Sequence, residues 1–206
     1  MANVAVVIVG INGWHEWTQP AIQSIQAFDP GIDLVVIDNA SDTPYPDAIQ
    51  LPARVCYAAA INIGIAAAGD PDWIVVLNND IVAIGSIQEA LAWMTHDALW
   101  GNQLITFGDL RWLGLWLFVI PRSIRRAVGP FDEAFEVCGF DDTDYCLRAQ
   151  QAGFRIEKSN LPVLHYGGKT RWAVPRYSEI RLKNKLYLET KHKIQIGDEK
   201  DWRVFN

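Results

Sequence analysis

The feature of this sequence that most constrains its fold is a series of short apolar segments, each followed within a few residues by polar side chains. The three clearest segments are residues 4–9, 34–37 and 73–77. The first polar residue expected at the end of each is Asn12, Asp38 and Asn78, respectively. Such runs are typical of buried strands, and the helical periodicity between them indicates an α/β domain with a mostly parallel sheet. Ligands bind these sheets at the carboxyl ends of the strands, so the polar residues mark the expected site.

The same pattern predicts where the main elements lie. Strands are expected over residues 4–9, 34–37, 53–57, 73–77 and 115–120. Helices are expected over residues 18–28, 59–68, 86–95, 142–152 and 175–192. A chain of 206 residues suits one domain with a short appendage.

The composition is that of an ordinary globular protein, because 50% of the residues are hydrophobic and 20% are charged. The apolar segment 4–9 is far shorter than the roughly 20 residues of a membrane span, and no basic residue precedes it. We therefore expect neither a transmembrane segment nor a signal peptide. Cys56, Cys138 and Cys146 show no CxxC spacing, which argues against a disulfide framework and favours a reducing, cytoplasmic setting.

A basic segment lies near the end of this acidic chain. Between Lys169 and Lys193 there are eight Lys or Arg residues against two acids, although the formal net charge of the chain is −6. Trp172, Tyr177 and Tyr187 are interleaved with the basic residues, as in a surface that receives phosphate, nucleic acid or anionic lipid. A lipid partner would place the protein peripherally at the inner membrane surface. A solvated amphipathic helix explains the segment equally well.

The strongest local signal is the strand 73–77, which ends in Asn78-Asn79-Asp80. A carboxylate at a strand end can hold a divalent cation whose other ligands are waters and substrate phosphates, as Mg²⁺ prefers. An Asp in this position also forms turns or caps helices. Neighbouring segments have to decide between these interpretations.

Two further segments carry polar groups next to predicted strands. Asp38 begins a run of polar residues that offers acceptors for a base or a ribose, and an Asx turn is the structural alternative. Asn62 is the one polar side chain in a stretch of Ala, Ile and Gly residues that lets a helix pack closely.

An acidic cluster lies at the start of the predicted helix 142–152. Asp141, Asp142 and Asp144 would stabilise a helix start through its dipole, by about 0.3 to 1 kcal/mol each. Three acids in four positions exceed what a helix start requires. A buried carboxyl among them, with its pKa raised by desolvation and by its neighbours, would act as a general base.

Taken together, these segments resemble the inverting nucleotide-sugar glycosyltransferases with the GT-A fold, in the order in which that family has them. The likeness covers residues 4–168 and looks closest to the rhamnosyltransferase-like branch of glycosyltransferase family two. The matching segments are Val9-Gly10-Ile11-Asn12, Ile37-Asp38-Asn39-Ala40-Ser41, Ala60-Ile61-Asn62-Ile63-Gly64, Asn78-Asn79-Asp80, Gly129-Pro130-Phe131-Asp132-Glu133, Asp141-Asp142-Thr143-Asp144 and His165-Tyr166-Gly167-Gly168. Asn78-Asn79-Asp80 resembles the DxD metal motif.

The resemblance implies a fold and a division of the chain. The fold is a Rossmann-like, mostly parallel sheet flanked by helices, with a C-terminal helix. Residues 1–168 would form the glycosyltransferase domain, in which 1–100 bind the nucleotide sugar and 101–168 face the acceptor. Residues 169–206 would form a basic, aromatic C-terminal helix and tail.

The resemblance also implies roles for single residues. Asp38 would bind the base of the donor, Asp80 would hold Mn²⁺ or Mg²⁺ with His165 completing the metal shell, and Asp142 would be the catalytic base. Asp144 would support the helix start or the acceptor. The remaining residues implied for the nucleotide sugar, a UDP- or dTDP-sugar, are Val9, Asn12, Asn62, Asn78 and Asn79.

Three positions differ from the pattern of the family. Asn78 replaces the first acid of the DxD motif, and Ile61 stands where an Arg is common, which leaves the diphosphate to the metal and to Lys169 or Arg171. Asp141 replaces the usual Glu, so both Asp141 and Asp142 are candidates for the base. Trp112 and Trp116 are candidates for a sugar-stacking platform, with burial in the core as the alternative.

Two other classes of function compete with glycosyl transfer. A sugar nucleotidyltransferase would carry a Gly-rich, basic loop after its first strand, and Gly10-Ile11-Asn12-Gly13-Trp14 is not such a loop. A catalytically inactive nucleotide-sugar-binding module would account for the lost DxD acid. For an active enzyme, the basic segment favours a polyanionic acceptor, such as modified nucleic acid, a phosphate-bearing glycan or a lipid-linked sugar.

Overall fold

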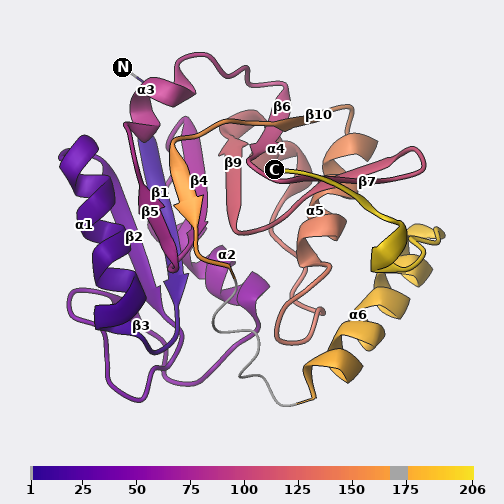
Figure 1. The fold of residues 1–206 in the computed structure, drawn as a ribbon, viewed down its shortest axis with the longest axis horizontal. Coiled ribbons are helices and arrows are strands. Elements are labelled where there is room, and N and C mark those ends of the chain that lie inside the picture. The colour runs from indigo at the N-terminus through magenta and orange to yellow at the C-terminus, as the bar shows by residue number, and fades with distance from the viewer. Residues whose placement is uncertain (1, 168–175) are drawn as a thin grey trace.

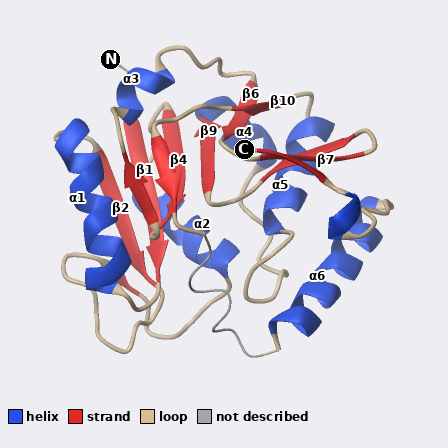
Figure 2. Ribbon diagram, viewed as in Figure 1, coloured by secondary structure: helices blue, strands red, loops and turns tan. Residues whose placement is uncertain are grey.

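The centre of the molecule is a seven-stranded mixed sheet with helices on both faces (Figures 1 and 2). The computed structural model describes residues 2–167 and 176–206. The strands of the sheet, in spatial order, are β10 (Arg155–Lys158), β6 (Ala98–Gly101), β9 (Leu117–Pro121), β4 (Trp73–Asn78), β1 (Val4–Gly10), β2 (Asp33–Asp38) and β3 (Ile49–Gln50). Only β9 runs antiparallel to its neighbours β4 and β6. This confirms the predicted α/β fold with a mostly parallel sheet.

Two smaller sheets stand beside the central one. β5 (Ile81–Ala83) pairs with β11 (Val163–His165), and β7 (Leu104–Phe107) lies between β8 (Leu110–Leu113) and β12 (Arg203–Phe205). The helices are α1 (Gln19–Phe28), α2 (Tyr57–Ala67), α3 (Ile87–Leu91), α4 (Arg122–Val128), α5 (Asp141–Gln151) and α6 (Tyr177–His192), together with a π-helical turn (Trp14–Thr18) and a 3₁₀ turn (Glu199–Asp201).

Strand β1 shows why the chain folds around this sheet. All seven of its residues are buried, and its side chains alternate between two hydrophobic clusters. Val6 and Ile8 pack with Ile25 of α1 on one face, whereas Val7 packs with Ile61 of α2 on the other. A strand covered on both faces reads as a continuous apolar run, which is the pattern that the sequence has here.

One predicted strand is wrong. Residues 53–56 form no strand, and Tyr57 already begins α2, while the strand that extends the sheet is the two-residue β3. The reason lies in Asn39, whose Nδ2 donates to the carbonyl of Val55 (3.0 Å) and whose Oδ1 accepts from the N–H of Val55 (2.9 Å). The backbone of Val55 thus bonds to a side chain where a strand would bond to a neighbouring strand.

Helix α6 is held against α5 by a buried carboxylate. Asp144 of α5 is fully buried and lies 2.8 Å from Nε of Arg148, 2.6 Å from Nζ of Lys191 and 2.7 Å from Nε2 of His192. Figure 1 shows α6 (yellow) alongside α5. After α6 the chain turns back, and β12 pairs with β7, so the tail extends the small sheet of β7 and β8. In the described ranges, no helix combines the length and the apolar character needed to cross a membrane.

Gly64 sets how closely α2 approaches the sheet. A Cβ atom at this position would lie 2.4 Å from Cγ1 of Val7 and 3.3 Å from Cγ1 of Ile37. We predict that Gly64→Ala destabilises the protein by about 1 to 3 kcal/mol, because α2 must move away from β1. The measurement is urea unfolding. Gly31→Ala is the matched control, because a Cβ there meets nothing within 4 Å, and an equal loss in both variants would contradict the prediction.

Candidate functional site

The register of the central strands gathers the predicted polar residues at one edge of the sheet. Val9 of β1 lies opposite Asn78 of β4, and Gly10 lies opposite Asp38 of β2. The chain segments after β1, β2 and β4 therefore leave the sheet side by side, as the sequence pattern predicted.

The small sheet of β5 and β11 brings His165 to Asp80. His165 pairs with Ile81 in this sheet, and the N–H of Tyr166 donates to the carbonyl of Asp80 (2.9 Å). Nε2 of His165 consequently lies 3.0 Å from Oδ1 of Asp80, whose side chain is buried. The two residues that the resemblance implied as metal ligands are neighbours in space although 85 positions separate them.

Asn78 and Tyr57 extend this pair. The Tyr57 hydroxyl donates to Oδ1 of Asn78 (2.7 Å), which turns Nδ2 of Asn78 toward Nε2 of His165 (3.4 Å). Desolvation, reinforced by the negative charges of Asp141 and Asp80, raises the pKa of Tyr57 well above its usual value, so its hydroxyl stays a donor. The ring of Trp116 stacks on His165 at 4.8 Å. These contacts fix the imidazole in one orientation.

The donor set at this position suits a transition metal. Imidazole nitrogen and carboxylate oxygen together are ligands for Mn²⁺, whereas Mg²⁺ prefers oxygen alone. Among the described residues, no three His, Cys, Asp or Glu side chains form a ligand cluster. A cation held by Asp80 and His165 would therefore complete its shell with water, with the amide of Asn78 or with ligand phosphates.

Two adjacent carboxyl groups begin α5, and their surroundings differ. Asp141 is 3% exposed, and its Oδ1 accepts from the N–H of Gly139 (2.8 Å). Its Oδ2 is buried and has no hydrogen-bond partner in the described part of the chain. Desolvation and the adjacent Asp142 raise the pKa of Asp141 to about 7.

Asp142 is half-buried and has donors at both oxygens. Oδ1 accepts from the N–H of Thr143 (2.7 Å) and from its hydroxyl (3.2 Å), and Oδ2 lies 3.4 Å from the N–H of Leu115. Desolvation raises the pKa of Asp142, while the bonds from Thr143 and the charge of Arg181 oppose that shift. The ionised form is thus better supported at Asp142 than at Asp141.

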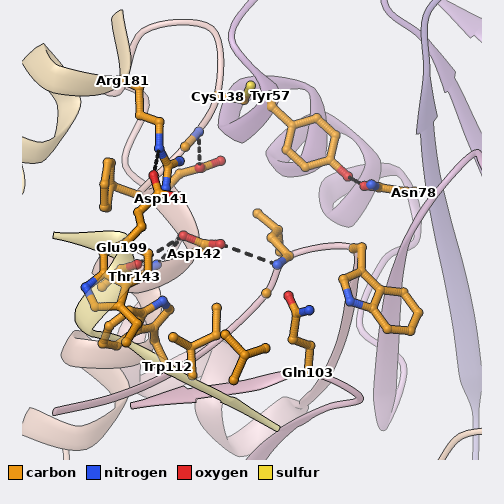
Figure 3. Close-up of a pocket in the computed structure, with 18 of the residues that line it drawn as sticks. Tyr57, Asn78, Gln103, Trp112, Cys138, Asp141, Asp142, Thr143, Arg181 and Glu199 are labelled. Carbon is orange, nitrogen blue, oxygen red and sulfur yellow. Dashed lines mark hydrogen bonds and ion pairs between the residues drawn. The ribbon is translucent and has the colours of Figure 1, made fainter. Parts of the chain in front are cut away.

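One cavity of about 570 Å³ is lined both by Asn78 and His165, which neighbour Asp80, and by the carboxyl pair Asp141 and Asp142. Figure 3 shows Tyr57 and Asn78 on one side of it and Asp141, Asp142 and Arg181 on the other. The lining residues that carry polar or aromatic chemistry are Tyr57, Asn78, Gln103, Trp112, Trp116, Phe140, Asp141, Asp142, Thr143, His165, Tyr177, Arg181, Glu199 and Trp202.

Four other predicted residues lie outside this lining and bond to neighbouring loops. Asp38 is 1% exposed, and its two oxygens accept from the N–H groups of Ser41 and Tyr45, both at 2.9 Å. Asn12 is exposed and exchanges two hydrogen bonds with Asp42. The other two are Asn79, which donates to Thr18, and Asn62, which bonds to Phe131 in both directions.

The structure places the candidate acceptor residues differently from one another. Trp112 lines the cavity but is only 2% exposed, and Asp144 is occupied by the contact between α5 and α6. Lys169 and Arg171 lie outside the described residues.

The sequence pattern does not predict Tyr57, Gln103, Glu199 or Trp202 as site residues, and they come from a helix start, a loop and the tail. No periodicity or spacing marks them.

No family model and no curated protein matches this sequence. Solved structures with a similar fold include GalNAc-T7 with UDP, GalNAc and Mn²⁺, with a TM-score of 0.69 and 13% identity over 95% of this chain and 55% of that one. The catalytic domain of Drosophila β1,4-galactosyltransferase 7 with xylobiose gives a TM-score of 0.60 and 14% identity over 89% of this chain and 81% of that one. The mannosyltransferase PcManGT from Pyrobaculum calidifontis with GDP-Man and Mn²⁺ gives a TM-score of 0.62 and 16% identity over 76% of this chain and 54% of that one.

These similarities confirm the predicted GT-A fold, with its mainly parallel sheet, flanking helices and C-terminal helix. The chain spans about half the length of GalNAc-T7 and of the mannosyltransferase. At these identities the comparisons define the fold of this chain, and what it does must come from its own site.

The buried carboxyl of Asp141 makes stability depend on pH. Because its pKa is about 7 in the folded protein and near 3.8 in the unfolded chain, the folded protein binds more protons between these values. Stability should therefore fall as the pH rises through this window, by up to about 1.4 kcal/mol per pH unit. We predict that Asp141→Asn raises the melting temperature at pH 8 and much less at pH 5, measured with EDTA present.

Asp132→Asn is the control for this measurement. Desolvation opposes the shift, but hydrogen bonds from Lys191 and Tyr187 lower the pKa of Asp132, so that its ionised form stabilises the fold. This variant should lower the melting temperature at pH 8. A pH-independent effect of Asp141→Asn would show that its carboxyl group is ionised throughout.

Proposed function

We propose that this protein is a metal-dependent glycosyltransferase that moves a sugar from a nucleoside diphosphate donor to an acceptor hydroxyl with inversion. One observation carries the proposal: a single cavity is lined by Asn78 and His165, next to Asp80, and by the carboxyl pair Asp141 and Asp142. Solved structures of similar fold contain UDP or GDP-Man together with Mn²⁺, which supports the same assignment here.

The donor would lie along the edge formed by the ends of β1, β2 and β4. The loops shaped by Asn12 and Asp38 would receive the nucleoside of a UDP- or dTDP-sugar, and Val9, Asn62 and Asn79 would fix the backbone around it. Asp80 and His165 would hold Mn²⁺ or Mg²⁺, with Asn78 beside them. When bound, the metal neutralises charge that develops on the diphosphate leaving group.

Asp142 is the proposed general base. Asp141 lacks donors at its buried Oδ2, so it retains a proton more readily and leaves Asp142 ionised. The carboxylate of Asp142 takes the proton of the acceptor hydroxyl while that oxygen bonds to the anomeric carbon. The bond from this carbon to the diphosphate breaks on the opposite face, and the configuration inverts.

The basic segment gives little support to a polyanionic acceptor. In its described part, Arg176 pairs with Glu179, and Arg181, Lys183 and Lys185 pair with acids outside α6. Lys191 and His192 pair with Asp144. Most positive charges of the described part of the segment therefore form ion pairs within the protein. An acceptor screen decides whether modified nucleic acid, phosphate-bearing glycans or lipid-linked sugars are used.

Two variants test the proposal. We predict that Asp142→Asn slows release of nucleoside diphosphate from a panel of nucleotide sugars by at least about 100-fold, while calorimetry shows unchanged UDP affinity. Asp80→Ala should remove the Mn²⁺ dependence of UDP binding. The exposed Asp47→Asn is the control for both and should behave as wild type.

Different results would select a different function. Normal turnover by Asp142→Asn would exclude it as the base. Pyrophosphate release from a nucleoside triphosphate and a sugar phosphate would identify a nucleotidyltransferase. Binding of UDP without any turnover would identify a nucleotide-sugar-binding module.

Tyr57 should affect the metal affinity of the proposed site indirectly, through its hydrogen bond to Asn78. Tyr57→Phe removes the hydrogen bond that orients Asn78 toward His165, and the loss of such supporting contacts lowers metal affinity about 10-fold or more. We predict this weakening in a Mn²⁺ titration followed by electron paramagnetic resonance. Tyr187→Phe is the matched control, because it removes a hydroxyl that is bonded to Asp132 and does not line the cavity. Equal Mn²⁺ affinity in both variants would contradict the prediction.

A further inference from the structure

The two tryptophans predicted to stack on an acceptor sugar both line the cavity, but each is already in contact with other side chains. Trp112 is 2% exposed and belongs to the main hydrophobic cluster of the domain. Trp116 is covered on one face by His165, on the metal side of the cavity. A third aromatic residue of the lining is therefore a further candidate for stacking on a sugar beside Asp142.

Trp202 of the tail supplies that surface. It lines the cavity and is half-buried, and its indole N–H donates to the carbonyl of Ile196 (2.7 Å). Its ring meets Trp112 edge-on at 5.0 Å and Phe140 edge-on at 6.2 Å. Three separate segments thus fix the indole, which also packs against the two hydrophobic clusters that contain Trp112 and Phe140. The part of Trp202 that stays exposed lines the cavity.

The tail that carries Trp202 is anchored on both sides of this residue. Before it, Glu199 forms an ion pair with Arg181 of α6. After it, Val204 pairs with Ile105 of β7, and the side chain of Asn206 accepts from Nε2 of Gln103 (2.8 Å). Glu199, Trp202 and Val204 all line the cavity, so the tail is a wall of the site.

The charges of the described residues in this part of the cavity do not suit an anion. Arg181 is the only Lys or Arg among the described lining residues. It is paired with Glu199, and its guanidinium lies 4.6 Å from the ring centre of Phe140. Asp141, Asp142 and Glu199 face the same space, so carboxyl groups outnumber the basic group.

We propose that the acceptor is an uncharged saccharide and that Trp202 is the residue on which its ring stacks, an inference that rests on the proposed glycosyl transfer. The part of the indole that lines the cavity would contact the apolar C–H groups of a sugar ring. Gln103 and the acid pair offer hydrogen-bonding groups for its hydroxyls, as is usual in a pocket that combines aromatic walls with a few polar side chains.

The test compares acceptors at fixed donor and Mn²⁺ concentrations. The probes are methyl glycosides of neutral hexoses and pentoses, including xylobiose, against methyl glucuronide, hexose 6-phosphates and a short oligonucleotide. Wild type should use a neutral glycoside, and Trp202→Ala should raise the KM for it about tenfold, as expected for the loss of one aromatic contact. Release of nucleoside diphosphate without acceptor, and UDP affinity, should be unchanged.

Three further variants separate stacking from folding. Trp93→Ala removes a tryptophan that is 90% exposed outside the cavity, and should leave the acceptor KM unchanged. Trp202→Phe keeps an aromatic ring in place and should recover most of the lost affinity. Glu199→Gln removes the partner of Arg181 and should improve use of methyl glucuronide relative to the neutral glycoside.

The outcomes that overturn the inference are distinct. Preference of wild type for a phosphate, a glucuronide or the oligonucleotide would refute an uncharged acceptor. If Trp202→Ala lowered acceptor use and donor hydrolysis equally, the role of Trp202 would be structural. The same conclusion would follow if Trp202→Ala unfolded the protein and Trp202→Phe did not restore acceptor affinity. Absence of nucleoside diphosphate release from every nucleotide sugar, both without an acceptor and with each acceptor of the panel, would refute glycosyl transfer itself, and this inference with it.

Discussion

The parallel pairing of β1 with β2 and β4 is the constraint on which the rest of the structure depends. Both faces of β1 are apolar, so alternation of side chains alone would not prevent the strand from slipping by one residue. Close contacts at its neighbours fix the register. Gly64 of α2 lies against Val7, and Gly10 lies so near Tyr45 that a Cβ would approach its ring to 2.9 Å. This register is what places Asn78 and Asp38 at one edge.

The sequence predicts those elements whose signal is local. β1, β2 and β4 are long apolar runs, and their polar ends are visible in the same window of residues. β5, β11 and β12 have three residues each, which is too short for a period to appear. Yet β5 and β11 bring His165 to Asp80, and β12 fixes the tail beside Trp202. The candidate site was therefore predictable at its strand ends and at the acidic helix start, but not where it depends on these short strand pairings.

The motif residues at the edge formed by β1, β2 and β4 show that a sequence pattern can predict where a residue lies without establishing its role. A buried carboxylate or amide requires hydrogen-bond partners, and Asp38 and Asn62 find theirs in adjacent loops. Asn39 does the same with Val55 and so abolishes a strand that the apolar pattern favoured. The shape of the edge is thus built from the polar groups that the sequence pattern offered as ligand contacts.

The two chemical centres belong to different parts of the fold, and their relative position depends on contacts that cross between them. Asp144 holds α6 on α5 and thereby sets Arg181, whose charge opposes the rise in the pKa of Asp142. On the other side, Tyr57 interacts with both centres, because desolvation raises its pKa and the negative charges of Asp141 and Asp80 raise it further. A protonated Tyr57 can donate to Asn78 whatever the state of the acid pair. The orientation of Asn78 toward His165 is therefore kept whatever the protonation state of Asp142. The proposed role of Asp142 as general base requires this, because a base gains and loses a proton in every turnover.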